Sequence, residues 1–239
     1  MFPKSRHKAV TFSFDDGVTQ DRRLIALLDK YGLKATFNLN SSSLGTKGVC
    51  HYKDWSAPHN KVEIEEVKEL YRNHEVAVHT VHHPDLTKIE SEQEIINEIE
   101  QDRQALEQLV GYQIVGMAYP FGTVNERVVR IIREHTPILY ARNIWATYSF
   151  DLQQNLLDFR PTVHCLDFDH LFALAKEFIE SDFKEDKVFY IWGHAYEFDF
   201  EDTWEKFEEF LKMISGHEDI FYGTNKEVML NGRKSENHH

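Results

Sequence analysis

Short apolar segments of two kinds alternate along the chain. Segments with alternating or continuous apolar residues predict β-strands at 8–14, 33–40, 75–79, 113–119, 137–144, 158–164, 187–193 and 218–224. Between them, apolar residues recur every three or four positions, as on one face of a helix. The clearest helical stretch begins at Ser91 and Glu94, which form a capping box, and stops at Gly111. Repeated strand–helix units predict a parallel sheet, and seven or eight units favour its closure into a barrel.

The chain of 239 residues fits one α/β domain. We place this domain at residues 8–230, with residues 1–7 as an N-terminal tail and residues 231–239 as a disordered C-terminal tail. Residues 41–60 form the longest stretch without a periodic pattern. A loop of that length inside a compact domain is often functional.

Polar residues collect where the predicted strands end. In parallel α/β folds the ligand site lies at the carboxyl ends of the strands. A hydrophobic core does not require polar residues there, so they indicate a functional site. They are Asp15 and Asp16, His79 to His83 ("HTVHH"), Tyr119 to Gly122 ("YPFG"), Arg142 to Trp145, His164 and His194.

His79 and His83 are candidate metal ligands. With 14 histidines in the chain, one such spacing is expected about once by chance, so the spacing alone decides nothing. Pro84 disfavours a helix at His83, so a strand would deliver His79 and a turn would bring His83 back. An acid from another strand end would complete a site of two histidines and one carboxylate. That ligand set occurs in catalytic zinc sites and also in non-haem iron oxygenases. Asp15 and Asp16 also have a structural alternative, because acids often occur in turns at strand ends or cap the next helix.

The motifs "TFSFDDG", "HTVHHPDL", "YPFG" and "WGH", in this order, resemble those of the polysaccharide deacetylase family. This family is also called carbohydrate esterase family 4 or the NodB-homology domain, and the resemblance covers most of residues 8–224. It implies a distorted (β/α) barrel of seven to eight parallel strands and hydrolysis of an N-acetyl group on a saccharide. It also implies one divalent ion held by Asp16, His79 and His83, with zinc expected and cobalt, nickel or manganese possible.

The resemblance also implies catalytic roles. Asp15 corresponds to the base, His194 to the general acid, and the backbone N–H of Phe121 to the oxyanion donor. Two departures stand out. Ala118 replaces an arginine that pairs with the base, and we expect Arg142 to take over that pairing. The aspartate that orients the acid histidine is missing, and only Trp145 is found in that motif.

Further residues near the strand ends are weaker candidates. Trp145 and Trp192 could wall an acetyl pocket or belong to the core, and Tyr119 is a predicted substrate-binding residue. Asn38, Asn40 and His164 also lie near strand ends and are candidates for substrate contacts.

The composition narrows the class of partner. A net charge of −13 argues against a general nucleic-acid or membrane-surface binder. Cys50 and Cys165 form no disulfide framework or metal motif, which is typical of reduced thiols in the cytosol. No signal peptide or membrane-length apolar run is visible, so we expect a cytoplasmic protein and an N-acetylated saccharide substrate.

Three other functions remain open at this stage. The chain could be a related C–N hydrolase acting on cyclic amides or ureides, an alternative that the alanine at 118 keeps open. It could be an inactive saccharide-binding domain, although the complete set of polar residues argues against this. An iron oxygenase fits poorly, because its ligands normally lie on an all-β double sheet.

Overall fold

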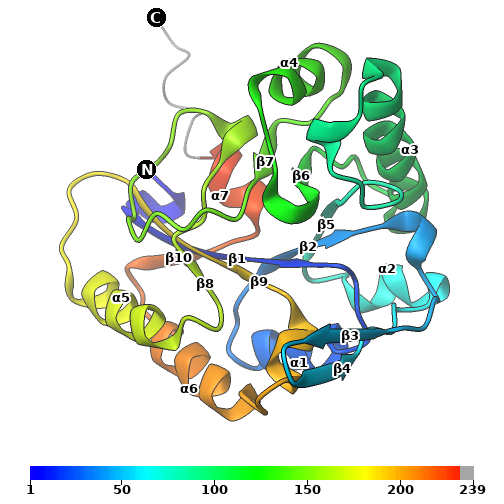
Figure 1. Ribbon diagram of the computed structural model, residues 1–239. Helices are drawn as coiled ribbons and strands as arrows, with labels where there is room; N and C mark the ends of the chain where they lie inside the picture. Colours follow the sequence, from blue (N-terminus) through cyan, green and yellow to red (C-terminus); the bar gives the residue numbers. More distant parts are fainter. Residues whose placement is uncertain (232–239) are drawn as a thin grey trace, which may run out of the picture.

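The computed structural model describes residues 1–231. Its main sheet is parallel, with the strand order β7-β6-β5-β2-β1-β9-β8, and β10 pairs with the first half of β1 (Figure 1). Every strand of this sheet lies within or overlaps a strand predicted from the sequence. The strands are β1 (Lys8–Asp15), β2 (Ala35–Leu39), β5 (Glu75–Val78), β6 (Gly116–Ala118), β7 (Tyr140–Arg142), β8 (Val163–His164), β9 (Lys187–Gly193) and β10 (Ile220–Tyr222).

Helices surround this curled sheet (Figure 1). They are α1 (Asp21–Lys30), α2 (Val67–Leu70), α3 (Glu92–Val110), α4 (Glu126–His135), α5 (Phe168–Glu180), α6 (Trp204–Ile214) and α7 (Asn225–Asn231). Short 3-10 turns are η1 (Pro3–Ser5), η2 (Ser41–Ser43), η3 (Ile64–Glu66), η4 (Leu86–Lys88), η5 (Pro120–Gly122), η6 (Leu156–Asp158) and η7 (Ala195–Asp199). A single parallel bridge joins Arg142, the last residue of β7, to Phe159, which lies between η6 and β8. The predicted distorted barrel of parallel strands is therefore confirmed.

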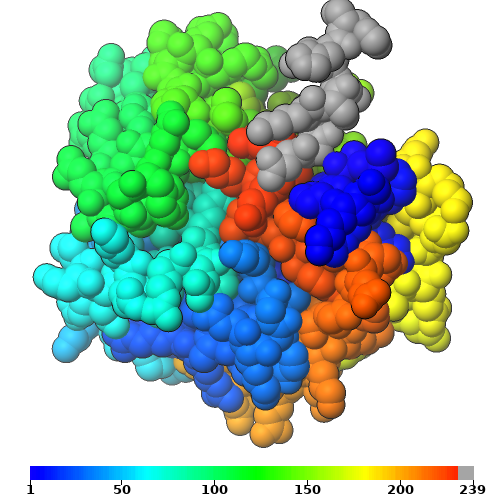
Figure 2. Space-filling model, turned by 180° about the vertical axis from the view of Figure 1, so that it is seen from behind, coloured from blue at the N-terminus to red at the C-terminus, as the bar shows by residue number. Residues whose placement is uncertain are grey.

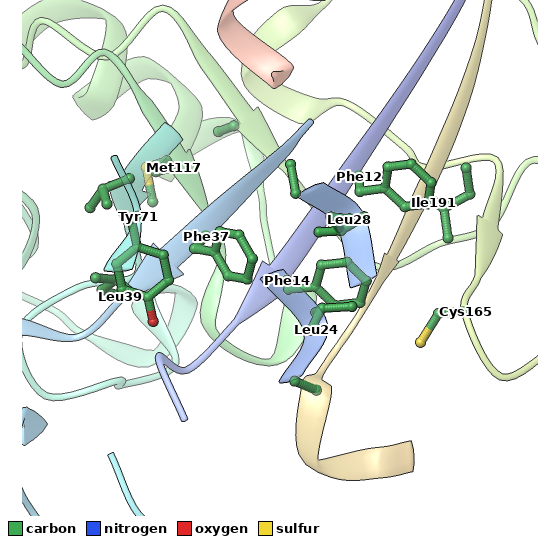
Figure 3. Packing of buried hydrophobic residues seen from close by; sticks show 14 of the residues in the cluster. Phe12, Phe14, Leu24, Leu28, Phe37, Leu39, Tyr71, Met117, Cys165 and Ile191 are labelled. Atoms are coloured by element: carbon green, nitrogen blue, oxygen red, sulfur yellow. The ribbon is translucent and has the colours of Figure 1, made fainter. Parts of the chain in front are cut away.

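The two faces of β1 meet different surroundings. Phe12 and Phe14 belong to the apolar cluster that also contains Leu24 and Leu28 of α1 (Figure 3). The Phe12 ring lies 6.4 Å from the Phe210 ring, and the Phe14 ring lies 6.3 Å from the Phe207 ring, both in α6. The alternate residues Thr11, Ser13 and Asp15 face the barrel interior. There Asn225 Nδ2 donates to Thr11 Oγ1 over 2.8 Å, and Arg142 Nε donates to Ser13 Oγ over 3.1 Å. The alternation along β1 thus separates an apolar layer from a polar interior that leads to the site.

Residues 41–60, expected to be irregular, contain an antiparallel hairpin. Its strands are β3 (Val49–Tyr52) and β4 (Trp55–Pro58), joined by Lys53 and Asp54. Lys53 has a φ of 53°, in the left-handed region that glycine or asparagine usually occupies in such turns. The hairpin was missed because neither residue of the turn is glycine or asparagine.

The N-terminal residues pack against the last part of the chain. Phe2 is buried and stacks on Phe221 with 6.2 Å between ring centroids, and Figure 2 shows this N-terminal segment against the orange C-terminal region. The predicted tail at 231–239 lies outside the described residues, apart from the backbone of Asn231. Within the described part of the chain, no helix combines the length and apolar character that crossing a membrane requires. Cys50 and Cys165 are both free thiols.

Candidate active site

The three candidate metal ligands come together at the carboxyl edge of the sheet. Asp16 follows β1, His79 follows β5, and His83 lies at the end of the turn after β5. One ligand atom from each of the three lies within 4.8 Å of the others. Two imidazole nitrogens and one carboxylate oxygen are a donor set that suits a divalent metal and leaves coordination positions open. The residues present therefore fit the ion that the sequence motifs imply.

The backbone at this edge adopts conformations that ordinary residues avoid. The φ angles are 83° at Asp16, 67° at Thr80, 57° at His83 and 58° at Phe121. Such left-handed conformations cost on the order of 1–3 kcal/mol each and collect at functional sites. The Thr80 hydroxyl accepts from the His83 N–H over 3.1 Å, which helps to hold the turn. Strain at both the acid and the second histidine supports a functional reason for their placement.

His79 is oriented by a backbone carbonyl. Its Nδ1 lies 2.9 Å from the carbonyl oxygen of Ala118, so Nδ1 carries the proton and Nε2 keeps its lone pair. That Nε2 lies 3.9 Å from Asp16 Oδ1. Burial lowers the pKa of His79, and burial with the nearby His79 lowers the pKa of His83 to about 4. Both rings are therefore neutral at pH 7, the form that binds metal ions.

Two residues that the sequence analysis missed hold Asp16. His59 Nε2 lies 3.1 Å from Asp16 Oδ2, and Lys61 Nζ donates to the Asp16 carbonyl over 2.7 Å. Lys61 and Val18 form an antiparallel bridge, so alternate residues 59 and 61 point to the same side, toward Asp16. Burial would raise the pKa of Asp16, but the His59 contact and the Lys61 charge bring it well below its usual range. The spacing His-x-Lys in an extended segment is the signal that could have found this pair.

The neighbouring Asp15 forms a buried ion pair with Arg142. Arg142 Nη2 lies 2.5 Å from both carboxylate oxygens, and the two side chains are 1% and 3% exposed. Asn38 Nδ2 adds a hydrogen bond of 2.8 Å to Oδ1. Burial would raise the pKa of Asp15, but the guanidinium outweighs this effect and lowers it. Asp15 is therefore ionised at neutral pH.

The expected pairing of Arg142 with Asp15 is explained by strand register. Ala118 on β6 and Arg142 on β7 are direct partners in the parallel ladder. Partners in register point to the same face of the sheet, so a guanidinium at either position starts from nearly the same place. The arginine absent at 118 is thus supplied from the adjacent strand.

His194, after β9, faces Asp15 from the other side. Its Nε2 lies 3.9 Å from Asp15 Oδ2, and its Nδ1 lies 3.2 Å from Glu197 Oε2. The same Glu197 oxygen accepts the His194 backbone N–H over 2.9 Å and lies 3.1 Å from His164 Nε2. Burial alone lowers the pKa of His194, but the Glu197 carboxylate outweighs it and raises that pKa to about 9. His194 is therefore protonated at neutral pH.

Glu197 occupies the place of the aspartate that the sequence analysis did not find. It comes from η7, three residues after the histidine that it contacts, rather than from the segment after β7. The spacing His-x-x-Glu was the available signal. His164, considered as a substrate contact, has its Nε2 3.1 Å from Glu197 Oε2.

The two tryptophans lie in different environments. Trp192 is 8% exposed, and its ring lies 4.7 Å from the Arg142 guanidinium and 4.7 Å from the His164 ring. It therefore packs beneath the ion pair rather than lining open space. Trp145 is 61% exposed at the rim after β7, so it can approach a substrate only from the solvent side.

Other predicted contacts have structural partners. The Tyr119 hydroxyl donates to the Leu157 carbonyl over 2.6 Å and is buried, so the structure does not offer it to a substrate. Asn40 Nδ2 donates to the carbonyls of His79 and Thr80, and thereby holds the strand end rather than a ligand. The Phe121 ring lies 4.7 Å from the His83 ring, which places its backbone beside the candidate metal ligands.

Comparison with known proteins agrees with this arrangement. A family model described as "Polysaccharide deacetylase" matches residues 3–136. Residues 3–136 include Asp15, Asp16, His79 and His83, while Arg142 and His194 lie beyond them. The peptidoglycan-N-acetylglucosamine deacetylase PgdA of Listeria monocytogenes is 32% identical over 134 residues, which are 54% of this chain and 25% of that protein. The chain thus spans about a quarter of the length of the curated relatives it matches.

Solved structures share the fold. A family 4 carbohydrate esterase from Streptomyces lividans, in complex with acetate, has a TM-score of 0.57 at 17% identity, covering 92% of this chain and 93% of that one. A pseudoenzyme of the same family, crystallised as a mutant with restored activity, has a TM-score of 0.59 at 17% identity, covering 93% and 67%. Because the family model matches more than half of the sequence, this chain belongs to the polysaccharide deacetylase family.

Proposed function

We propose that this protein is a divalent-metal-dependent hydrolase that removes the acetyl group from an N-acetylated saccharide. One observation carries the proposal. An ionised carboxylate, Asp15, and a protonated imidazole, His194, face each other across 3.9 Å beside the Asp16–His79–His83 cluster. The similarity to a deacetylase that acts on N-acetylglucosamine in peptidoglycan supports the substrate class.

The protein's own residues divide the work of amide hydrolysis. A divalent ion held by Asp16, His79 and His83 would act as a Lewis acid toward the water and the acetyl carbonyl. Asp15 then accepts a proton from the water whose oxygen attacks the carbonyl carbon. The acetamide nitrogen leaves as the C–N bond breaks, and His194 Nε2 donates the proton that this nitrogen needs. The backbone N–H of Phe121 would stabilise negative charge on the carbonyl oxygen.

The neighbours of Asp15 and His194 set their opposite charges. Arg142 keeps Asp15 ionised and fixes both of its oxygens, so the base is ready to accept a proton. Glu197 keeps His194 protonated and contacts Nδ1, which leaves Nε2 toward the reaction centre. Two titratable groups whose surroundings favour opposite protonation states are the arrangement that acid–base catalysis uses.

The alternative function, hydrolysis of cyclic amides or ureides, was kept open because the sequence has no arginine at position 118. Ala118 left the base without its arginine in the sequence, but Arg142 supplies that guanidinium from the adjacent strand. No specific contact in the described residues favours a cyclic substrate over an acetylated sugar.

The test combines metal content with product release. Protein purified without chelator is analysed for divalent metal, and acetate release from oligomers of N-acetylglucosamine is measured with added zinc or cobalt. We expect one ion per chain and metal-dependent release of acetate. Metal-loaded protein that releases no acetate from any N-acetylated saccharide would contradict the proposal, and protein that binds no metal after soaking would remove the mechanism.

A further inference from the structure

A second group of side chains able to bind a metal lies beside His194, on the side away from the reaction centre. His194 faces Asp15 with Nε2 and Glu197 with Nδ1. One ligand atom each from His164, Cys165 and Glu197, a nitrogen, a sulfur and a carboxylate oxygen, lies within 4.8 Å of the others. His164 ends β8, Cys165 follows it, and Glu197 belongs to η7. The mechanism above uses the carboxylate and gives the imidazole of His164 and the thiol no role.

The three donor types match zinc. Zinc is bound in proteins by thiolate, imidazole and carboxylate groups, and three protein ligands leave one coordination position open. The group differs from the Asp16–His79–His83 set by its sulfur. A thiolate favours zinc over manganese, magnesium or calcium, which prefer oxygen ligands. The two sets of ligands should therefore differ in the ions that they accept.

A glycine on β9 brings the sulfur and the carboxylate together. A Cβ atom on Gly193 would lie only 2.2 Å from Cys165 Sγ and 3.3 Å from Glu197 Oε2. Because glycine has no Cβ, both groups can approach the same point of the strand. The Cys165 N–H donates to the Trp192 carbonyl over 2.8 Å, which fixes the segment after β8 beside β9. The strand pairing thus places the sulfur within reach of the carboxylate.

The group borders a cavity through which an ion can enter. His164 and Glu197 line this cavity, which has a volume of about 410 Å³ and is bounded on another side by residues 50–52 of β3. Cys165 is fully buried and is not part of the lining. An ion held by the two residues at the wall would therefore take its third ligand from inside the protein. Its fourth ligand, a water molecule, would come from the cavity.

An ion at this group would disturb contacts that the folded protein already makes. Glu197 Oε2 accepts the His194 N–H over 2.9 Å and lies 3.2 Å from His194 Nδ1, and a cation bound to this carboxylate competes with both contacts. His164 Nδ1 accepts the Leu166 N–H over 3.2 Å. Binding through Nε2 moves the ring proton to Nδ1 and ends that bond. Because these contacts are lost, we expect the group to bind zinc more weakly than the Asp16–His79–His83 set.

We propose that His164, Cys165 and Glu197 form a second zinc site, whose occupancy withdraws Glu197 from His194 and inhibits the enzyme. The inhibition rests on the proposed function, because it takes His194 to be the proton donor, whereas the binding does not. Purified protein then holds one ion, and the second binds only when zinc is in excess.

Cobalt titration of metal-free protein tests the site by its sulfur. A cysteine thiolate bound to cobalt gives a charge-transfer band in the near ultraviolet, which nitrogen and oxygen ligands do not give. The catalytic set contains no sulfur, so this band reports only the second site. Cys50→Ala is the matched control, because Cys50 lines the same cavity but lies outside the group. We expect two ions per chain and the band in wild type and in Cys50→Ala, but one ion and no band in Cys165→Ala.

His164→Ala gives a second measurement that leaves the core intact, since this side chain is 26% exposed. It should weaken binding of the second ion by more than about tenfold, because even an outer partner of a metal ligand contributes about 10–100-fold to affinity. The first ion should stay bound. Wild-type protein that binds only one cobalt ion in excess cobalt, or a band that persists in Cys165→Ala, would overturn the site.

Acetate release from the trimer of N-acetylglucosamine, measured at increasing zinc, tests the inhibition. In wild type we expect release to rise with the first ion and then to fall roughly tenfold or more, since a general acid contributes about 10²–10⁴-fold. Cys165→Ala should reach the same level and stay there. A sulfur band without loss of activity in excess zinc would refute the inhibitory role. If no acetate is released at any zinc concentration, the proposed function and the inhibition both fail, and the cobalt band alone decides whether the second site exists.

Discussion

The ion pair between Arg142 and Asp15 can be tested by replacing the arginine with methionine, which keeps much of the apolar stem. The guanidinium Nη2 lies 2.5 Å from both carboxylate oxygens, and water has almost no access to either side chain. Two unit charges about 4 Å apart interact by about 4 kcal/mol at an effective dielectric constant of about 20. Removing one partner of a buried pair typically costs about 3–5 kcal/mol. We expect Arg142→Met to lower the free energy of unfolding by that amount.

A double-mutant cycle isolates the pair from the other contacts of Arg142. Arg142 also donates to Ser13 Oγ and to the Asn143 carbonyl, and these bonds are lost in the single variant too. Urea unfolding of metal-free wild type, Arg142→Met, Asp15→Asn and the double variant should give a coupling energy of about 3 kcal/mol or more.

The exposed pair of Arg22 and Glu66 serves as the control. Its two bonds measure 3.0 and 2.6 Å, but the side chains are 49% and 34% exposed. Such a pair should couple by only about 0.2–1 kcal/mol. A coupling below about 1 kcal/mol for Arg142 and Asp15 would refute the reasoning that burial makes this pair strong.

The same variant should change the dependence on pH. The pKa of Asp15 in the folded protein is lowered, so its stabilising contribution is present above the unfolded pKa of 3.8 and is lost as pH falls through the folded pKa. Without Arg142 the carboxylate is still buried, and burial raises the pKa of Asp15. The acid limb of the activity profile should therefore move to higher pH. Ala118→Arg in an Arg142→Ala background should bring the limb partly back.

Three other predictions concern the residues around the candidate metal ligands. Asp16→Asn should weaken metal binding in a titration, with partial rescue of acetate release by excess metal, whereas Asp15→Asn should keep the metal and lose turnover without rescue. The reverse pattern would exchange the two roles. His59→Ala should weaken metal binding by about 10–100-fold in competition with a chelator, because it frees the Asp16 carboxylate, and an unchanged affinity would contradict this role. Glu197→Gln should move the alkaline limb of the activity profile down from about pH 9, because it lowers the pKa of His194, and should harm amide substrates more than aryl acetates. An alkaline limb that stays in place would remove Glu197 from the mechanism.

The sequence alone was sufficient to predict the strands of the main sheet and the edge of that sheet where the candidate site lies. A buried strand can be predicted from a few neighbouring residues, as in β1, where apolar residues alternate with small polar ones. Because the strands are parallel, their carboxyl ends all lie at the same edge of the sheet. Asp15, Asp16, His79 and His83 could be singled out because they lie at the end of such a strand or in the turn that follows it. The β3–β4 hairpin was hidden, because its turn uses lysine and aspartate where the usual signal is glycine or asparagine.

Only the tertiary structure decided which residues support the site. Asn38 and Asn40 looked like substrate contacts because they also end a strand, but their amides face Asp15 and the backbone at His79. For Glu197 and His59 the sequence offered only the spacings His-x-x-Glu and His-x-Lys, which do not show that these residues contact His194 and Asp16. The physical reason is that a contact between distant segments depends on strand register and on how the chain returns, and neither segment contains that information by itself. The guanidinium of Arg142 reaches Asp15 because β7 lies beside β6 in register, a relation that exists only once the barrel has formed.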